Sequence, residues 1–468
     1  MISRTFGLQC TPRILRVSGV LRSILLAAFA CTISQGQTVN VVASFSGQGC
    51  SAGPSGPVVQ GRDGKLYGTT LGISGSAGCF FRLFSSGLSF PFAFQSSNGD
   101  EPAGGVLLAT DGNFYGVTQY GGSSNNGVFY KVTATGSYTA VHEFGGGADG
   151  ANPIAPPIEA SDGNIYGVTL GSFTLPATLY RYSPQTGTFV NVYTFDATHG
   201  QYPSSLIQGT DGNLYGTSTW GGSSSCGTLF KISTSGTPLW SYSFPCGSGG
   251  YNPVMLVQAS DGNFYGPTVN GGVGIGFGTI FKLDPEGNVS TLYSFSPSSS
   301  KAGEPLSLIQ ANDGNLYGTA ALGGKTTNDG SLFEITPSGV FTRLYSFSGT
   351  AGTTPNTALV QDTTGILYGT SIGGGKSNAG TVYKLNNGLA PFVTFVLPVG
   401  KVGQNVEILG QGLTGTTGVT FNGISATSFR VLSDSYMTAV VPNGATTGPV
   451  AVSTPSGSLT SNVNLRID

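Results

Sequence analysis

Short runs of apolar and aromatic residues alternate with turn residues through most of the chain. Between residues 205 and 244 these runs cover 205–208, 214–217, 228–232 and 239–244. Runs of about four to six residues bounded by Gly, Asp, Asn or Ser are typical of β-strands. Asp-Gly-Asn separates the first two runs and Ser-Gly the last two, and both sequences favour the positive φ angles of tight hairpin turns. The pattern therefore predicts two successive hairpins.

This four-strand pattern repeats along the chain with a period near 50 residues. Six copies of Asp-Gly-(Asn/Lys)-apolar-Tyr-Gly occur, and residues 364–369 (TGILYG) form a degenerate seventh copy. The repeated tyrosines are Tyr67, Tyr115, Tyr166, Tyr215, Tyr265, Tyr317 and Tyr368. Four short strands in about 50 residues match one blade of a β-propeller. The sequence therefore predicts an all-β protein with a seven-bladed β-propeller over residues 40–386.

The two ends of the repeat region are complementary. A strand of the Tyr-Ser-Phe type, always ending in Phe, closes the units, but one copy precedes the first unit, at residues 41–45, and none follows the last run, at 381–385. We therefore expect the N-terminal strand to complete the last blade. Such a strand would remove an open sheet edge, which is otherwise prone to pair with other chains.

The repeats resemble a known bacterial repeat family. The units DGNLYGTSTWGGSSSCGTLFKI (211–232) and DGNLYGTAALGG (313–324), with LYSF following at 292–295 and 344–347, are similar to the GloVer-type tandem repeat of exported bacterial proteins, also called choice-of-anchor proteins. The resemblance covers most of residues 40–386. It implies a secreted or cell-surface location and no particular activity.

Residues 390–468 form a second predicted domain, because the 50-residue period stops after residue 385. Short alternating runs at 406–409, 418–421, 437–441 and 450–453 are typical of a β-sandwich. The segments GQNVEILGQGLTG (403–415) and VTFNGISATSF (419–429) resemble an IPT/TIG immunoglobulin-like domain. This resemblance implies a spacer, a cap or an adhesive module.

Composition excludes several classes of protein. The 468 residues include 76 Gly but only 19 Lys+Arg and 21 Asp+Glu, which gives a net charge of −2. Glycine-rich, charge-poor sequences do not form long helices or coiled coils. A chain without excess positive charge offers no field for nucleic acid. The Gly-rich loops lack the Lys-Ser/Thr ending of a phosphate-binding loop, and we expect no cofactor.

The N-terminus reads as a signal peptide over residues 1–36. Four arginines and no acids precede the apolar run 23–33, and small residues at 34 and 36 favour cleavage before Gln37. A run of about eleven apolar residues is too short to span a bilayer. The rest of the sequence contains no apolar run of about 18 residues, the length that spanning requires. The mature protein is therefore expected to be secreted, on the cell surface or in the periplasm, without a transmembrane segment.

Export changes the interpretation of the cysteines. Removal of the leader leaves Cys50, Cys79, Cys226 and Cys246, an even number suited to an oxidising compartment. Cys226 precedes one predicted strand and Cys246 follows its hairpin partner, which favours the pairs Cys226–Cys246 and Cys50–Cys79. Free buried thiols are the alternative. A zinc site is disfavoured because no Cys-x-x-Cys pair and no nearby His accompany them.

Candidate binding residues lie in the predicted loops after the second and fourth strands, which vary between units while the hairpin turns repeat. Aromatic and amide side chains there suit sugars, through stacking and hydrogen bonds. The candidates are Tyr120, Asn152, Tyr202, Trp220, Tyr251, Asn252 and Glu304. An ordinary polar surface would have the same composition. The Asp of each Asp-Gly-Asn is interpreted as a turn cap, because one carboxylate per hairpin cannot supply the six to eight oxygens that calcium takes.

Three functional hypotheses follow. The first is a non-catalytic binding or adhesion module for extracellular glycan or a surface protein. The second is a polysaccharide hydrolase or lyase, in which Glu101 with Glu304, or Asp100 with Asp149, would form an acid pair. The third is a structural surface-layer component that associates with itself. The first is our interpretation, because no catalytic motif is present in the sequence.

Overall fold

The computed structural model describes residues 38–468 except 52, 73–75, 172–174, 275, 297–301 and 324–327. The predicted signal peptide lies outside the described residues. The described chain consists of strands and three short 3-10 helices, η1 (Gly49–Ser51), η2 (Gly147–Asp149) and η3 (Gly349–Ala351). The fold is therefore all-β, as the sequence predicts.

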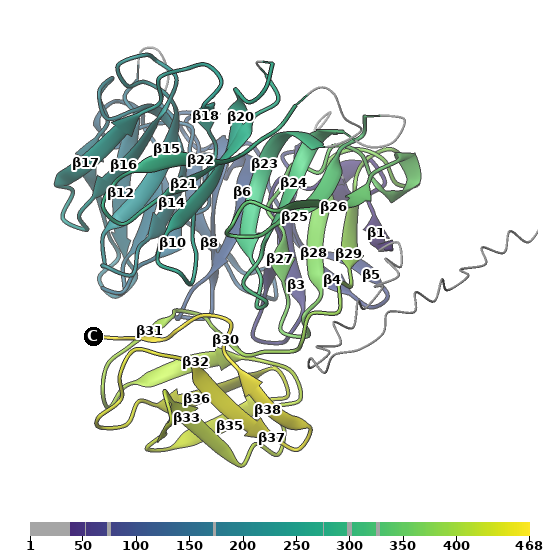
Figure 1. Ribbon diagram of the computed structural model, residues 1–468, viewed down its shortest axis with the longest axis vertical. Coiled ribbons are helices and arrows are strands. Elements are labelled where there is room, and N and C mark those ends of the chain that lie inside the picture. The colour runs from purple at the N-terminus through teal and green to yellow at the C-terminus, as the bar shows by residue number, and fades with distance from the viewer. Residues whose placement is uncertain are drawn as a thin grey trace, which may run out of the picture. The chain divides into compact units, whose positions relative to one another are not determined.

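Seven antiparallel sheets, numbered 1 to 7 here, follow one another over residues 39–385 (Figure 1). Sheet 1 contains β2 (Val59–Gln60), β3 (Leu66–Thr70), β4 (Cys79–Phe84) and β5 (Gly87–Ala93). Sheet 2 contains β6 (Asp100–Leu108), β7 (Phe114–Tyr120), β8 (Val128–Val132) and β9 (Tyr138–Glu143). Sheet 3 contains β10 (Ile158–Glu159), β11 (Ile165–Val168), β12 (Thr178–Ser183) and β13 (Thr188–Thr194).

The next three sheets repeat this order. Sheet 4 contains β14 (Gln201–Gln208), β15 (Leu214–Trp220), β16 (Thr228–Ile232) and β17 (Pro238–Ser243). Sheet 5 contains β18 (Tyr251–Pro253) and β19 (Val257–Gln258), which both pair with β20 (Phe264–Asn270), then β21 (Thr279–Leu283) and β22 (Val289–Ser294). Sheet 6 contains β23 (Ala302–Gln310), β24 (Leu316–Gly323), β25 (Ser331–Ile335) and β26 (Phe341–Ser346).

Sheet 7 is built from both ends of the repeat region. It contains β27 (Val360–Gln361), β28 (Leu367–Ser371), β29 (Thr381–Leu385) and the N-terminal strand β1 (Val39–Ser44). β1 pairs antiparallel with β29, from Val39 opposite Leu385 to Ser44 opposite Thr381. The N-terminal strand thus completes the last sheet, as the position of the extra strand copy in the sequence predicts.

The repeated hexapeptide is explained by its hydrogen bonds and packing. Oδ1 of Asp111 accepts the backbone N–H of Asn113 at 2.9 Å, and Oδ2 accepts the Tyr115 hydroxyl at 2.7 Å. The same Asp–Tyr bond recurs in sheets 1 to 6. The Asp is therefore the turn cap that the sequence predicts, and it also anchors the buried tyrosine.

Adjacent sheets share hydrophobic cores. Tyr166 and Leu179 of sheet 3, for example, pack with Leu214 and Phe230 of sheet 4. Each consecutive pair of sheets from 1 to 7 has such a cluster. Sheets 7 and 1 share one as well, which includes Phe45, Phe81 and Val382.

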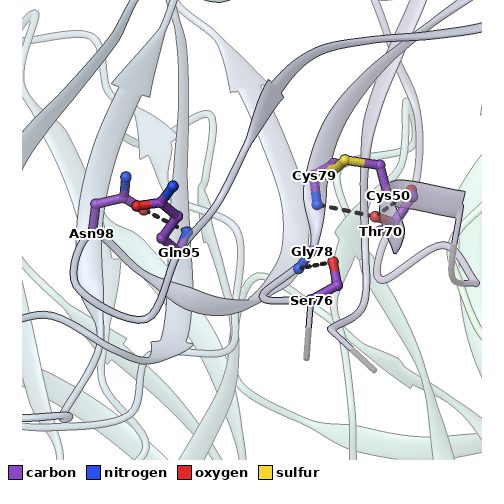
Figure 2. Close-up of a disulfide and its surroundings, with 7 residues drawn as sticks. All are labelled: Cys50, Thr70, Ser76, Gly78, Cys79, Gln95 and Asn98. Atoms are coloured by element: carbon purple, nitrogen blue, oxygen red, sulfur yellow. Dashed lines mark hydrogen bonds between the residues drawn. A yellow bond between two sulfur atoms is a disulfide. The ribbon is translucent and has the colours of Figure 1, made fainter. Parts of the chain in front are cut away.

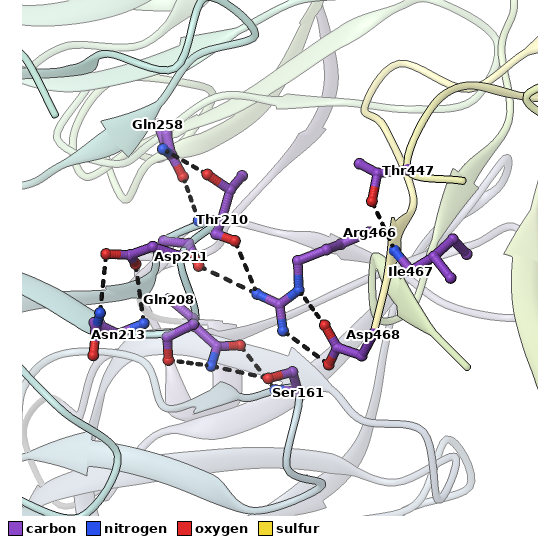
Figure 3. Close-up of polar contacts among 12 residues, drawn as sticks. Ser161, Gln208, Thr210, Asp211, Asn213, Gln258, Thr447, Arg466, Ile467 and Asp468 are labelled. Atoms are coloured by element: carbon purple, nitrogen blue, oxygen red, sulfur yellow. Dashed lines mark hydrogen bonds and ion pairs between the residues drawn. The ribbon is translucent and has the colours of Figure 1, made fainter. Parts of the chain in front are cut away.

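A second set of contacts joins the sheets at the end that carries the Asp-Gly-Asn turns. Oε1 of Gln258 accepts the backbone N–H of Thr210 at 2.8 Å, and Oε1 of Gln208 accepts that of Ser161 at 2.8 Å (Figure 3). We call each of these contacts an amide clasp: the last side chain of a first strand accepts the backbone N–H of the residue two positions before the turn Gly of the preceding sheet. Five clasps use Gln, and Glu159 takes the same role toward Thr110.

Residues 390–468 form their own pair of four-stranded sheets. One sheet has the order β30 (Thr394–Phe395), β32 (Asn405–Leu409), β36 (Tyr436–Val440), β35 (Phe429–Ser433). The other has the order β34 (Ile424–Ser425), β33 (Gly418–Phe421), β37 (Val450–Thr454), β38 (Gly457–Thr460). A short parallel pair, β31 (Val399–Gly400) with β39 (Arg466–Ile467), completes the segment. Side chains from both sheets, including Ile408, Phe421, Met437 and Val452, form a core of their own.

The C-terminal segment contacts the turn end of several sheets. Arg62 of sheet 1 forms an ion pair with Glu407 at 2.6 Å, and the Ser435 hydroxyl donates to the Arg62 carbonyl at 2.8 Å. Arg466, held by Asp468 at 2.8 Å, donates to the Thr210 carbonyl of sheet 4 at 3.3 Å (Figure 3). These contacts occupy turns that the repeat otherwise presents to solvent.

Candidate binding surface

The seven sheets have two chemically different ends. The turn face carries the Asp-Gly-Asn hairpins and the contacts with the C-terminal segment. The loop face, at the other end of the strands, carries the connections between the second and third strands and between successive sheets. All seven candidate residues lie on the loop face, as the sequence predicts. Most of them lie at strand ends rather than in loops.

The strands reach further than predicted on the loop face. The pattern predicts strands at 205–208 and 214–217, whereas β14 spans Gln201–Gln208 and β15 spans Leu214–Trp220. Pairing continues past an irregularity between Pro203 and Ser205, so that Gln201 lies opposite Trp220. Tyr202 and Trp220 are therefore held by a backbone ladder. The prediction of loop positions is wrong for Tyr120, Tyr202, Trp220, Tyr251, Asn252 and Glu304, which all lie in strands.

Trp220 is the most prominent aromatic side chain on the loop face. It ends β15 and is 52% exposed, while Tyr120 at the equivalent end of β7 is 36% exposed. An aromatic ring held at the end of a paired strand can stack on the C–H face of a sugar.

Asn252 joins the next sheet to the end of β15, one residue before Trp220. Its side-chain N–H donates to the carbonyl of Thr219 at 2.7 Å, and its backbone N–H donates to the carbonyl of Cys226 at 2.8 Å. Tyr251, half-buried, therefore lies beside the end of β15 as well. The structure thus places Tyr202, Trp220, Tyr251 and Asn252 at neighbouring strand ends of sheets 4 and 5, and we call these four residues the Trp220 platform.

The disulfide Cys226–Cys246 braces this platform. It joins the connection between β15 and β16 to the segment after β17, with a Cα–Cα distance of 5.5 Å. Because the carbonyl of Cys226 also accepts the Asn252 N–H, the bridge holds both loops beside Trp220. The pairing is the one that the sequence favours.

The second disulfide, Cys50–Cys79, lies elsewhere. It links the segment after β1 to the start of β4, with a Cα–Cα distance of 5.2 Å (Figure 2). The Thr70 hydroxyl donates to the Cys50 carbonyl at 3.1 Å and accepts the backbone N–H of Cys79 at 3.0 Å. This bridge therefore connects the strand that completes sheet 7 to sheet 1.

A smaller version of the platform occurs between sheets 2 and 3. The Asn152 side chain donates to the carbonyl of Gln119 at 3.1 Å, next to Tyr120. The side-chain amides of Asn152 and Asn252 therefore each donate a hydrogen bond to the preceding sheet. These two residues position neighbouring strand ends relative to each other. Glu304 occupies the equivalent position at the start of sheet 6, apart from both clusters.

Sequence reasoning missed that several candidates are one repeated position. Six residues that precede a proline have positive φ between 51° and 56°: Glu101, Asn152, Tyr202, Asn252, Glu304 and Thr354. Such a conformation costs about 1–3 kcal/mol for a non-glycine residue. Backbone N–H groups here donate to the preceding sheet, as from Glu304 to Phe277 at 2.9 Å, which offsets that cost. The recurring X-Pro pair was the available signal.

The carboxylates considered for catalysis are not paired with one another. Asp149 accepts hydrogen bonds from the Gly145 N–H and contacts His142 Nε2, both at 3.0 Å. Asp100 accepts the Ser96 hydroxyl at 3.3 Å. Glu101 and Glu304 belong to sheets 2 and 6, with sheets 7 and 1 between them. His199 Nδ1 lies 2.8 Å from Asp196. Burial alone would raise the pKa of Asp196, but the hydrogen bonds from His199 lower it below its usual value.

The described part of the chain holds no group of three or more His, Cys, Asp or Glu side chains arranged to bind a metal ion. Within the same residues, no helix has the length and apolar character needed to cross a membrane.

Comparison with known families identifies the repeat. The model of the Gloeobacter/Verrucomicrobia repeat matches residues 27–209 and 202–431, which is most of the chain. The chain belongs to this family. The second match extends past residue 385 into the C-terminal segment of this Gloeobacter/Verrucomicrobia repeat protein. No curated protein matches the chain significantly.

Solved structures similar to this repeat protein include extracellular domains of two candidate hybrid two-component systems from B. thetaiotaomicron. The first has a TM-score of 0.53 and 12% identity and covers 80% of this chain and 46% of its own. The second has a TM-score of 0.51 and 13% identity and covers 89% and 52%. The chain thus spans about half the length of these domains. A periplasmic gluconolactonase from Pseudomonas aeruginosa has a TM-score of 0.47 and 16% identity and covers 70% and 96%. The two extracellular domains are β-propeller-like, and the likeness to them shows the fold alone.

Proposed function

We propose that this repeat protein is an exported, non-catalytic binding or adhesion module that holds an extracellular glycan or a surface protein on its loop face. The Trp220 platform is the observation that carries the proposal. An indole that is 52% exposed lies at the end of a paired strand, with Tyr202 and Tyr251 at neighbouring strand ends and a disulfide in the loop that follows, and it forms a firmly held contact surface. Rigid aromatic contacts lose little entropy on binding.

The proposed scaffold is a closed seven-bladed β-propeller over residues 40–386, followed by an IPT/TIG-type immunoglobulin-like domain over 390–468. The core shared by sheets 7 and 1 and the clasp from Gln60 to Thr363 support closure. The separate core and paired sheets of the C-terminal segment support the second domain. In this scaffold the C-terminal domain covers part of the turn face, whereas the loop face is open to a large ligand.

Export is part of the same proposal. The predicted leader over residues 1–36 would direct the chain out of the cytoplasm. The two disulfides support an oxidising compartment, because such bonds persist mainly in secreted and periplasmic proteins. We assign the protein to the cell surface, the extracellular medium or the periplasm.

The first test is binding and product release measured together. The chain from Gln37 is incubated with insoluble and soluble polysaccharides, and retention and released sugars are both scored. We expect retention without release, with a weak to moderate dissociation constant. Trp220→Ala should weaken binding at least about tenfold, because stacking on an exposed aromatic ring is lost.

Val340→Ala is the matched control, since Val340 is 62% exposed but lies on the turn face. It should leave binding unchanged. Release of sugars would support the hydrolase or lyase hypothesis instead. Absence of any bound polysaccharide, combined with self-association, would support a structural surface-layer role.

A further inference from the structure

A small pocket opens on the turn face between sheets 4 and 5. Its volume is about 150 Å³. It is lined by Tyr215, Lys231, Leu239 and Trp240 of sheet 4 and by residues 283–287 of sheet 5. Tyr215 and Trp220 are at opposite ends of β15, roughly 17 Å apart at the usual rise of a strand. The pocket is therefore separate from the Trp220 platform.

The wall from sheet 4 offers an aromatic surface and a hydrogen-bond donor. Trp240 lies opposite Lys231 in the β16–β17 ladder. The Lys231 ammonium lies 2.8 Å from Asp211 and 5.2 Å from the centre of the Tyr215 ring. Its charge is thus balanced by Asp211. Burial alone would raise the pKa of Asp211, but hydrogen bonds from Lys231 and Asn213 lower it to about 2. An ammonium has three N–H groups, so one remains for a ligand.

The wall from sheet 5 offers acceptors. Asp284 caps its turn by accepting both the backbone and the side-chain N–H of Asn288, at 2.7 and 2.8 Å. Glu286 is exposed and forms no ion pair with the described residues. Gly287 lies against Trp240: a Cβ placed there would be 2.9 Å from the indole Nε1. The glycine lets this turn approach the edge of the ring.

Both walls depart from the repeat, and the other sheets show what the fold itself needs. The ladder position of Trp240 is held by smaller residues in sheets 1, 2, 3, 5 and 6: Ser89, Thr139, Val190, Ser290 and Thr342. The positions of Asp284 and Glu286 are held by Thr133 and Thr135 in sheet 2 and by Thr336 and Ser338 in sheet 6. Hydroxyl caps at Thr133 and Thr336 close those turns equally well. The blade therefore does not require a large aromatic residue or carboxylates here.

We propose that this pocket binds a single pyranose ring of a neutral sugar. The C–H face of the ring would stack on Trp240, its hydroxyls would donate to Glu286 and Asp284, and Lys231 would donate to a hydroxyl oxygen. A cationic ligand without an acceptor would leave the remaining Lys231 N–H unbonded, and an anionic one would meet two carboxylates. A neutral polyol with both donors and acceptors satisfies both walls, and the pocket has room for about one ring.

The chain contains two tryptophans, Trp220 and Trp240, and each lies at one of the two sites. Single-tryptophan variants therefore report on the sites separately. In W220F the remaining signal comes from Trp240, and in W240F it comes from Trp220. Failure of the loop-face function would leave the W220F experiment unaffected, so the two proposals are tested independently.

The experiment titrates W220F with methyl glucopyranoside, methyl galactopyranoside and methyl mannopyranoside, and with choline as a cationic probe. We expect a saturating change of Trp240 fluorescence with at least one glycoside, with a dissociation constant on the order of 1 mM for a ligand of this size. Choline should cause no change. In the W220F background, E286Q should weaken binding at least about fivefold, because a charged acceptor is lost.

Ser338→Ala in the same background is the matched control, since Ser338 occupies the position of Glu286 in sheet 6. It should leave the titration unchanged. The proposal is overturned if no glycoside alters the Trp240 signal, if choline does so instead, or if E286Q binds as well as its parent. Glu286 is exposed, so E286Q tests the site without disturbing the core.

Discussion

At the scale of single residues, each position of the hexapeptide repeat has its own role in packing or in hydrogen bonding. In sheets 1 to 6 the Tyr of the copy is buried and bonded to the turn Asp; burial, with the nearby Asp63 carboxylate, raises the pKa of Tyr67 to about 12. The Gly that follows lies under an aromatic ring of the third strand, which is Phe in four sheets and Tyr in three. Tyr130, Tyr180 and Tyr383 are those three, and their buried hydroxyls have no hydrogen-bond partner in the described structure. Burial raises the pKa of all three phenols.

Tyr180→Phe should therefore stabilise the protein. An unpartnered buried hydroxyl costs about 1–3 kcal/mol, and Phe at the equivalent positions of sheets 1, 4, 5 and 6 shows that the ring fits. We expect a gain of about 1 kcal/mol in the free energy of unfolding, measured by denaturant titration. Tyr166→Phe, in the same sheet, is the control and should lose about 1 kcal/mol, because the Tyr166 hydroxyl donates to Asp162 at 2.7 Å. A loss for Tyr180→Phe would show that its hydroxyl is satisfied.

At the scale of elements, the amide clasps link neighbouring sheets in sequence. One junction departs from the rule: Leu108 of sheet 2 replaces the clasping amide, and Arg62 of sheet 1 instead donates to the Thr110 carbonyl at 2.7 Å and pairs with Glu407. Leu409, Val396 and Tyr436 of the C-terminal segment pack at this same junction. The C-terminal segment therefore supports the one junction that lacks a clasp.

Gln258→Leu tests a clasp directly. It removes the acceptor of the Thr210 N–H and the donor to the Gly262 carbonyl, at 2.8 and 3.1 Å. We expect a loss of about 1–2 kcal/mol in the free energy of unfolding, since a net hydrogen bond contributes about 1 kcal/mol. The exposed Gln185→Leu, in the turn after β12, should change stability by less than about 0.5 kcal/mol. Equal effects of the two substitutions would mean that the clasps are not stabilising.

At the scale of the whole molecule, the joint between sheets 7 and 1 brings distant parts of the chain together. β1 pairs with β29 across more than 300 residues of sequence, and Gln60 clasps Thr363. The Cys50–Cys79 bridge then ties the chain leaving β1 to β4. A backbone ladder, a clasp, a core and a disulfide thus meet at one joint.

Replacing Cys50 and Cys79 by Ser should open this joint. We expect a loss of about 2–4 kcal/mol in the free energy of unfolding and faster hydrogen exchange of the amides in β1 and β29. Cys226→Ser with Cys246→Ser is the control: its loop of similar length should give a similar loss of stability. Its effect on exchange should instead be confined to the Trp220 platform. Unchanged exchange in β29 after loss of Cys50–Cys79 would contradict a role in joining the sheets.

The sequence by itself determined the all-β class, the number and order of the repeated strands, the strand that completes sheet 7 and the pairing of the cysteines. These features depend on turn chemistry and on periodicity, which are local and repeated seven times. Only the tertiary structure decided that Asn252 of one sheet bonds to Thr219 of another, that Arg62 meets Glu407, and that Trp240 and Glu286 line one pocket. Such contacts depend on the angle and distance between sheets. Those are set by side-chain packing between residues far apart in sequence, for which a single chain carries no local signal.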